Sequence, residues 1–200
     1  RLRKLVFVRP QITLHDASIS RDSLSRILDS MFRGWPVLST RVELSIRSDR
    51  DPVVVLAADE KFAMPLAATV RSALDNLAAD RKLCIFVLDG GLSDATKERL
   101  VQSWPKGRYD VAWVNVDPSQ VLELPITGDK HLNHVCYFRV LMPWLVPKEV
   151  KRAIYLDSDM IVCADLGLLW DVGEREYVCQ AVQDCAVPYI DPQAALVNYN

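Results

Sequence analysis

From residue 53 onward, short apolar runs alternate with segments whose apolar residues recur at helical spacing. The apolar runs have strand length and show no alternation of polar and apolar positions, so we expect strands that are buried on both faces. Pro65 suits the first turn of a helix, and Ser93 suits an N-cap. The predicted strands are residues 53–58, 83–88, 109–116, 152–156 and 177–182, and the predicted helices are residues 64–79, 93–104 and 132–145, with a short helix opening at Asp117-Pro118.

Buried strands that alternate with helices are typical of a mainly parallel sheet with helices on both faces. The predicted fold class is therefore α/β and Rossmann-like. Ligands of such sheets bind beyond the carboxyl ends of the strands. Every predicted strand is followed there by an acidic residue, and these residues are Asp59, Asp89, Asp117, Asp157 (with Asp159) and Asp184. So many carboxylates at one edge of a sheet suggest a cation site.

The first fifty residues have a weaker pattern. They contain an apolar run at 5–8, a predicted helix from Ser18 or Ser20 to about Phe32, a weak edge-strand alternation at 40–46 and a polar linker at 47–52. No chemistry is evident in this part. We interpret residues 1–50 as an N-terminal extension or the tail of a preceding domain, with no role assigned.

Composition narrows the classes of function. The 200 residues carry a net charge of −2 with a pI near 5.9, which argues against a nucleic-acid-binding surface. No apolar run reaches the roughly 18 residues of a membrane span, and the chain opens without a signal-peptide pattern. The five cysteines form no Cys-x-x-Cys pair, so we expect buried free thiols in a reducing compartment. The seven glycines form neither a dinucleotide fingerprint nor a P-loop, so a phosphorylated ligand would need a metal or an arginine.

Asp157-Ser158-Asp159 is the strongest candidate for such a metal site. It follows a buried strand, and carboxylates at i and i+2 can point to one side where a strand leaves the sheet. Mg²⁺ and Mn²⁺ prefer oxygen ligands and bridge carboxylates to diphosphates. The spacing alone is common, since Asp49 and Asp51 repeat it in the linker. The alternative is a pair of turn carboxylates that cap backbone amides.

Three further residues are candidates for ligand contacts. Arg139 stands in an apolar helical run, where it would either pair with an acidic residue at the sheet edge or bind a diphosphate. His131 lies about two helical turns before Arg139 and would be either structural or part of the site. Phe62 would either stack on a base or pack in the core.

These motifs together resemble the family-8 retaining glycosyltransferases, which transfer sugars from UDP-sugars. The similar segments are residues 55–62, residues 86–93, the stretch from His131 to Pro143, and residues 151–162 continuing to Trp170. They fall in order at familiar spacings over about 130 residues. The resemblance implies the glycosyltransferase A-type fold, with residues 53–200 as an incomplete UDP-sugar-binding part that is truncated at its C-terminus.

The resemblance also implies roles by position. Donor contacts would come from Ala57, Asp59, Phe62, His131, Arg139, Asp157, Ser158 and Asp184, and Mn²⁺ (or Mg²⁺) would be held by Asp157 and Asp159. Lys61 departs from the family, which often has Asn or a small polar residue there. A third metal ligand and the acceptor-binding half would lie beyond Asn200.

The function that these residues predict is metal-dependent transfer of a hexose, glucose or galactose, from a UDP-sugar to a saccharide, a lipid-linked acceptor or another hydroxyl acceptor. We expect this in cell-surface polysaccharide biosynthesis, with the protein in the cytoplasm or peripheral to the inner face of a membrane, and with the 200-residue chain inactive alone. One alternative is a non-catalytic nucleotide-sugar-binding module. Another is a haloacid-dehalogenase-type phosphotransferase, which the absence of a Lys after Asp159 disfavours.

Overall fold

The computed structural model describes residues 6–8, 49–117, 121, 134–147, 149–172 and 179–181. Its strands are β1 (Val6–Val8), β2 (Val53–Ala58), β3 (Leu83–Asp89), β4 (Tyr109–Asn115), β5 (Ala153–Tyr155) and β6 (Cys179–Ala181). Its α-helices are α2 (Ala63–Asn76), α3 (Asp94–Ser103), α4 (Phe138–Leu145) and α5 (Leu166–Val172), and its 3-10 turns include η1 (Glu60–Phe62) and η3 (His134–Tyr137). The helix expected near residues 18–32, the strand near 40–46 and most of the short helix after Asp117 lie outside the described residues.

The described strands form one sheet in the order β4-β3-β2-β5-β1-β6. Strands β4, β3, β2 and β5 are parallel, as predicted for a doubly covered α/β sheet. Strand β1 inserts between β5 and β6 and is antiparallel to both. The apolar run at residues 5–8 therefore contributes to the same sheet as the later strands.

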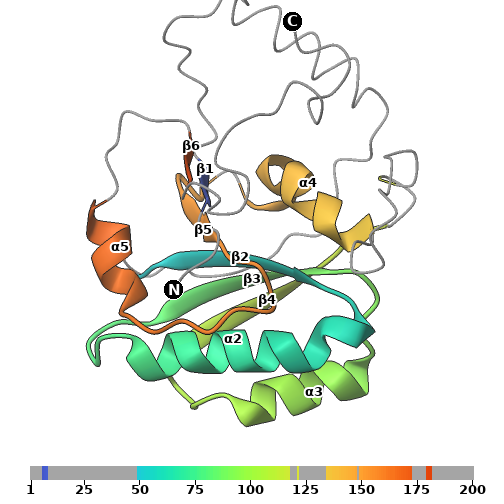
Figure 1. The fold of residues 1–200 in the computed structure, drawn as a ribbon, viewed down its shortest axis with the longest axis horizontal. Coiled ribbons are helices and arrows are strands. Elements are labelled where there is room, and N and C mark those ends of the chain that lie inside the picture. The colour runs from blue at the N-terminus through green and yellow to red at the C-terminus, as the bar shows by residue number, and fades with distance from the viewer. Residues whose placement is uncertain are drawn as a thin grey trace, which may run out of the picture.

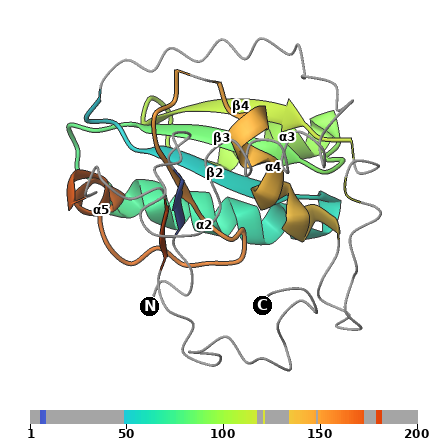
Figure 2. The ribbon, with the colours of Figure 1, turned by 90° about the horizontal axis from the view of Figure 1, so that it is seen from above.

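Helices cover both faces of this sheet, which confirms the predicted fold class. Figure 1 shows α2 and α3 on one face and α4 on the other. Seen from above, α4 crosses the sheet toward the end where β2 finishes, whereas α5 lies at the opposite end (Figure 2). All residues of β2 and β3 are buried, because these central strands contact helices on each side.

The helix boundaries follow local chemistry. The Ser93 side chain accepts a hydrogen bond from the Thr96 amide and caps α3, as predicted. Helix α2 ends at Asn76, three residues before the predicted end. The segment expected to be helical from residue 132 is a 3-10 turn at His134–Tyr137, and the α-helix begins only at Phe138. Helix α5 was not predicted from the sequence.

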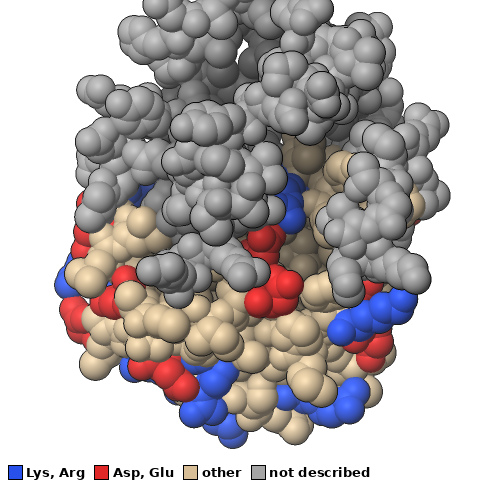
Figure 3. All heavy atoms as spheres, viewed as in Figure 1, with Lys and Arg blue, Asp and Glu red and all other residues tan. Residues whose placement is uncertain are grey.

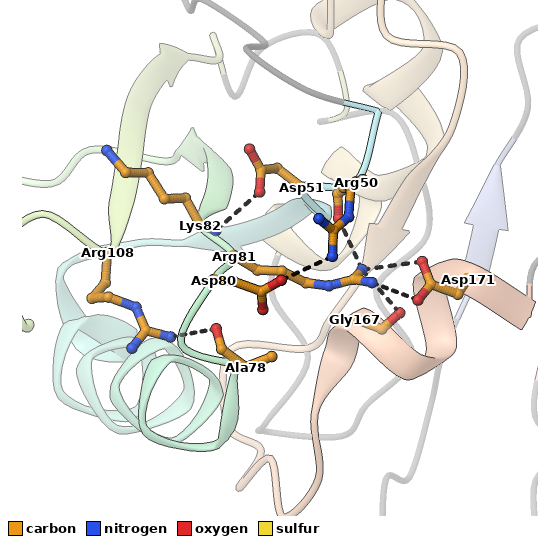
Figure 4. A network of polar contacts seen from close by, with 9 residues as sticks. All are labelled: Arg50, Asp51, Ala78, Asp80, Arg81, Lys82, Arg108, Gly167 and Asp171. Carbon is orange, nitrogen blue, oxygen red and sulfur yellow. Dashed lines mark hydrogen bonds and ion pairs between the residues drawn. The ribbon is translucent and has the colours of Figure 1, made fainter.

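A polar cluster joins the linker at residues 49–51 to the amino-terminal end of the sheet (Figure 4). The Arg81 guanidinium contacts both carboxylate oxygens of Asp171 on α5, at 3.1 and 2.5 Å, and also donates to the carbonyl of Arg50. This pairing raises the pKa of Arg81 and lowers that of Asp171. The Trp170 indole donates to the carbonyl of Asp49 at 2.8 Å. The cluster therefore fixes α5 against the start of β2.

Candidate functional site

The carboxyl ends of β2, β3 and β5 meet at one edge of the sheet. The Leu156 amide donates to the carbonyl of Val55 at 3.0 Å, which extends the β2–β5 ladder past the last residue of β5. On the other side of β2, the Gly90 amide donates to the carbonyl of Ala58 at 2.9 Å. The segments that follow these three strands are therefore held beside one another, as the rule for parallel sheets predicts.

The loop that carries Asp157 and Asp159 leaves β5 at this edge. Asp159 is exposed and the Asp157 side chain is 21% exposed, so both carboxylates are open to solvent. Ser158 between them is buried, and its hydroxyl donates to the carbonyl of Ala57 at 2.7 Å. The alternation thus directs Ser158 inward and leaves the two carboxylates outside.

Arg139 lies beside this loop. Its Nη2 is 3.0 Å from Oδ1 of Asp157, and its Nε donates to the carbonyl of Cys136 at 2.8 Å. Its guanidinium carbon lies 4.9 Å from the ring centroid of Tyr155, within the range of a cation–π contact. The sequence left open whether Arg139 pairs with an acidic residue, and in the structure it pairs with Asp157. Its side chain is still 35% exposed, so it remains accessible to an anion.

Close packing at Gly90 sets the position of the segment that carries Arg139. A Cβ atom placed on Gly90 would stand 2.7 Å from Cγ2 of Val135 and 3.3 Å from Cε2 of Phe138. Both neighbours belong to the η3–α4 segment, so only glycine lets this segment approach the end of β3. The glycine after Asp89 therefore contributes indirectly to where the guanidinium lies.

The end of β2 supplies the remaining described candidates. Asp59 caps the turn η1, and its Oδ1 accepts from the amides of Lys61 and Phe62 at 3.0 and 3.1 Å. Phe62 is half-buried and packs against the core, which leaves part of its ring exposed at this edge. Ala57 is buried and presents its carbonyl to Ser158. Contact of Ala57 with a ligand would therefore involve the strand backbone.

Asp89 does not contribute an open carboxylate to the edge, so the expectation of an acidic cluster there needs correction. Its side chain is 4% exposed; one oxygen accepts from the amides of Gly91 and Leu92, and the other lies 2.7 Å from Nζ of Lys97. These contacts occupy both oxygens of the carboxylate, so Asp89 is not available to bind a metal ion. Sequence position alone could not reveal this, because it does not show that amides of the turn after β3 and the Lys97 side chain contact the Asp89 carboxylate.

The thiols also depart partly from expectation. Cys84 is buried in β3, and burial raises its pKa to about 12. Cys136 is half-buried and Cys163 is exposed, so the expectation of buried thiols is wrong for Cys163. In the uncharged run at residues 160–164, Met160 and Val162 are buried while Ile161, Cys163 and Ala164 are exposed, so an apolar neighbourhood in the sequence does not imply burial.

Two candidate residues, His131 and Asp184, lie outside the described residues. Within the described part, no group of three or more His, Cys, Asp or Glu side chains is arranged to hold a metal ion. The assignment of Asp157 and Asp159 as metal ligands therefore stays a prediction.

One residue that contacts this loop was missed in the sequence. Thr69 of α2 is fully buried, and its hydroxyl lies 2.9 Å from the carbonyl of Ser158 and 2.7 Å from that of Met160. In the sequence, Thr69 recurs at helical spacing with Ser72 and Asn76, and this pattern does not identify the partners of its hydroxyl.

Comparison with known proteins defines the class. The profile described as "Glycosyl transferase family 8" matches residues 53–198. The chain belongs to this family. It is 31% identical over 140 residues to General stress protein A of Bacillus subtilis (strain 168), covering 70% of this chain and 48% of that protein. It is 30% identical over 131 residues to Glycosyltransferase GlyF of Streptococcus pneumoniae serotype 4, covering 66% of this chain and 31% of that protein.

A solved structure agrees with this assignment. The galactosyltransferase LgtC, in complex with donor and acceptor sugar analogues, superposes with a TM-score of 0.56 at 25% identity, covering 60% of this chain and 42% of that one. The chain thus spans about half, or less than half, of the proteins it matches. No helix among the described residues is both long and apolar enough to cross a membrane.

Proposed function

We propose that this chain is the donor-binding part of a metal-dependent retaining glycosyltransferase that transfers glucose or galactose from a UDP-sugar. The observation that carries the proposal is the position of the Asp157-Ser158-Asp159 loop at the carboxyl edge of the sheet, beside Arg139, in a chain that belongs to glycosyl transferase family 8. Nucleotide ligands of open α/β sheets bind at this edge.

Each residue would serve a different part of the donor. The end of β2, with the backbone of Ala57, the carboxylate of Asp59 and the ring of Phe62, suits the uracil and ribose. Arg139 suits the diphosphate, because a guanidinium forms paired, charge-assisted hydrogen bonds with phosphate oxygens. Ser158 would align the loop through its bond to Ala57. His131 and Asp184 are proposed near the transferred sugar on the family resemblance.

The side chains available as metal ligands fit a hard cation. Asp157 and Asp159 offer only oxygen ligands, both carboxylates are solvent-accessible, and they flank a single residue. Two carboxylates leave coordination positions for diphosphate oxygens, water or a further side chain, as Mg²⁺ and Mn²⁺ require. When bound, the metal would neutralise the charge of the departing diphosphate.

In the structure, Arg139 and Asp157 neutralise one another. Donor binding would separate this pair, with Arg139 contacting phosphate and Asp157 contacting the cation. The two new charge-assisted contacts would replace the old one, so no charge is left alone at the edge. The acceptor would be a saccharide, a lipid-linked sugar or another hydroxyl compound.

Calorimetric titration with UDP, with and without Mn²⁺, tests the proposal. We expect Mn²⁺ to strengthen UDP binding, Asp159→Ala to abolish that effect, and Asp49→Ala to leave it unchanged. Asp49 is a matched control because it belongs to the second Asp-x-Asp pair and contacts Trp170 only through its carbonyl among the bonds described. A parent protein that ignores Mn²⁺, or equal effects of the two substitutions, would contradict the proposal.

Transfer itself is tested by UDP release from UDP-glucose and UDP-galactose. This chain spans less than half of the proteins it matches, and we expect it to bind donor without turnover. Without a positioned acceptor, the proximity contribution, which can reach about 7–11 kcal/mol, would be lost. Turnover comparable to that of a longer form of the protein would show that these residues hold the whole site. A cytoplasmic location, free or at the inner face of a membrane, stays a prediction.

A further inference from the structure

One face of α2 carries three polar residues, of which Thr69 is buried, Ser72 is half-buried and Asn76 is exposed. Thr69, Ser72 and Asn76 are spaced by three and four residues, which places them on the same side of the helix. All three contact the segment that runs from Ser158 to Val162 (residues 158–162). The segment that follows β5 is thus bonded to a helix far from it in the sequence.

Thr69 makes the central contacts. Its hydroxyl oxygen accepts from the Met160 amide at 3.0 Å and lies within donating distance of the carbonyls of Ser158 and Met160, at 2.9 and 2.7 Å. These backbone groups border Asp159 on both sides. Thr69 and Ser158 are both buried, so no solvent is available to replace the hydroxyl.

The rest of the face extends the attachment. Ser72 accepts from the Val162 amide at 2.9 Å, and its own hydroxyl donates to the carbonyl of Thr69 at 2.9 Å. Asn76 donates to the carbonyl of Val162 at 3.0 Å. On the opposite side, the Ser158 hydroxyl donates to the carbonyl of Ala57. The loop is therefore held between α2 and β2, and Thr69 contacts it closest to the carboxylates.

We infer that Thr69 is a positioning residue for the Asp157–Asp159 pair: its hydroxyl holds the peptide groups on either side of Asp159, so that both carboxylates present to one cation. This rests on the proposed metal-dependent function. A rotation of either peptide group would turn the Asp159 side chain away from Asp157. Groups that orient metal ligands from behind typically change metal affinity by about 10- to 100-fold when they are lost.

The test compares Thr69→Val, which keeps the shape and removes the hydroxyl, with Thr69→Ser, which keeps the hydroxyl. Two readouts are needed: hydrogen exchange of the Met160 amide without metal, and Mn²⁺ binding followed by electron paramagnetic resonance with and without UDP. We expect Thr69→Val to lose protection at Met160 and to bind Mn²⁺ about 10- to 100-fold more weakly. Thr69→Ser should restore both.

Thr96→Val is the matched control. Thr96 is a buried threonine of α3 whose hydroxyl contacts Ser93, Glu60 and Arg99, and none of the bonds described for it reaches the loop. It should lose thermal stability while Mn²⁺ affinity and Met160 protection stay at the parent values. If Thr69→Val does not fold, Thr69→Cys replaces it; its weaker hydrogen-bonding group should give intermediate losses.

The outcomes separate the two proposals. A parent protein that binds neither Mn²⁺ nor Mn²⁺–UDP contradicts the metal-dependent function and this inference with it. A parent that binds both, with unchanged Mn²⁺ affinity in Thr69→Val, overturns only the inference. The same holds if Thr96→Val weakens Mn²⁺ binding as much as Thr69→Val does, because the effect would then follow stability and not the loop.

Discussion

Replacing Asp157 by Asn should have opposite effects on UDP binding with and without metal. The substitution keeps the shape of the side chain and removes its charge. Asp157 lies 3.0 Å from Nη2 of Arg139, where it would compete with the phosphates of UDP for the guanidinium. Without Mn²⁺, Asp157→Asn should therefore bind UDP more tightly than the parent. With Mn²⁺, it should bind more weakly, because one of two carboxylate ligands is gone.

The magnitude follows from the exposure of the pair. Side chains that are 35% and 21% exposed are screened by solvent, so the ion pair is assigned about 1 kcal/mol, the upper end for exposed pairs. A competing contact of that strength leaves the guanidinium free about one-sixth of the time, and removing it should tighten metal-free UDP binding by about sixfold. Loss of one carboxylate should remove the Mn²⁺ enhancement, which we expect to be about tenfold or more.

Isothermal titration with UDP in EDTA, and then in excess Mn²⁺, measures both effects on one variant. Asp49→Asn serves as the control, since it removes the same charge from the linker pair. Weaker UDP binding by Asp157→Asn in EDTA would show that Asp157 supports the phosphate site directly. A retained Mn²⁺ enhancement would show that Asp157 is not a metal ligand. Either result would refute the partner exchange between Arg139 and Asp157.

Three further changes have defined outcomes. Arg139→Met should lower UDP affinity by about tenfold or more while uridine affinity stays constant, because a charge-assisted bond to phosphate contributes about 1.5–3 kcal/mol; equal losses for both ligands in parallel titrations would make Arg139 a structural residue. A maleimide at pH 8 should label Cys163 in the folded protein and Cys84 only after unfolding, since burial raises the pKa of Cys84 to about 12. Rapid labelling of Cys84 in the folded protein, detected by mass spectrometry, would contradict this. Asp171→Asn should lower the free energy of unfolding at neutral pH. Because Arg81 lowers the pKa of Asp171 in the folded state, this loss should persist above the ordinary carboxyl pKa of 3.8 and vanish as the pH falls through the lowered value. A loss that does not depend on pH in urea titrations would argue against the pair.

The parallel core was predictable because its determinants are local. The strand expected at residues 53–58 has those bounds in the structure, and the Ser93 cap lies where it was expected. Unbroken apolar runs with turn residues around them specify a buried strand with few alternatives. The Asp-x-Asp loop and Arg139 also lie side by side, as expected for residues near the carboxyl ends of parallel strands.

The rest depended on partners that the sequence does not place. Asp89 directly follows an apolar run in the sequence, as Asp59 and Asp157 do, yet its carboxylate accepts hydrogen bonds from two amides and pairs with Lys97. The role of Thr69 is not evident in the sequence, because its partners lie about ninety residues away. On the face drawn in Figure 3, acidic and basic side chains are interspersed over the described residues, so charge patterning gave no further indication of a site.

The insertion of β1 between β5 and β6 has a consequence for the order of folding. Val6 pairs with Tyr155 on one side and with Ala181 on the other. Strand β1 therefore finds both of its partners only after residues up to Ala181 have been synthesised, whereas β2, β3 and β4 pair between near neighbours along the chain. Contacts of such long range form slowly, because the loop must close before any bond offsets its entropy. Until β1 pairs with β5, the strand that leads into Asp157, one side of the β5 backbone is open to pairing with another chain. Co-translational aggregation is therefore the specific hazard of this topology.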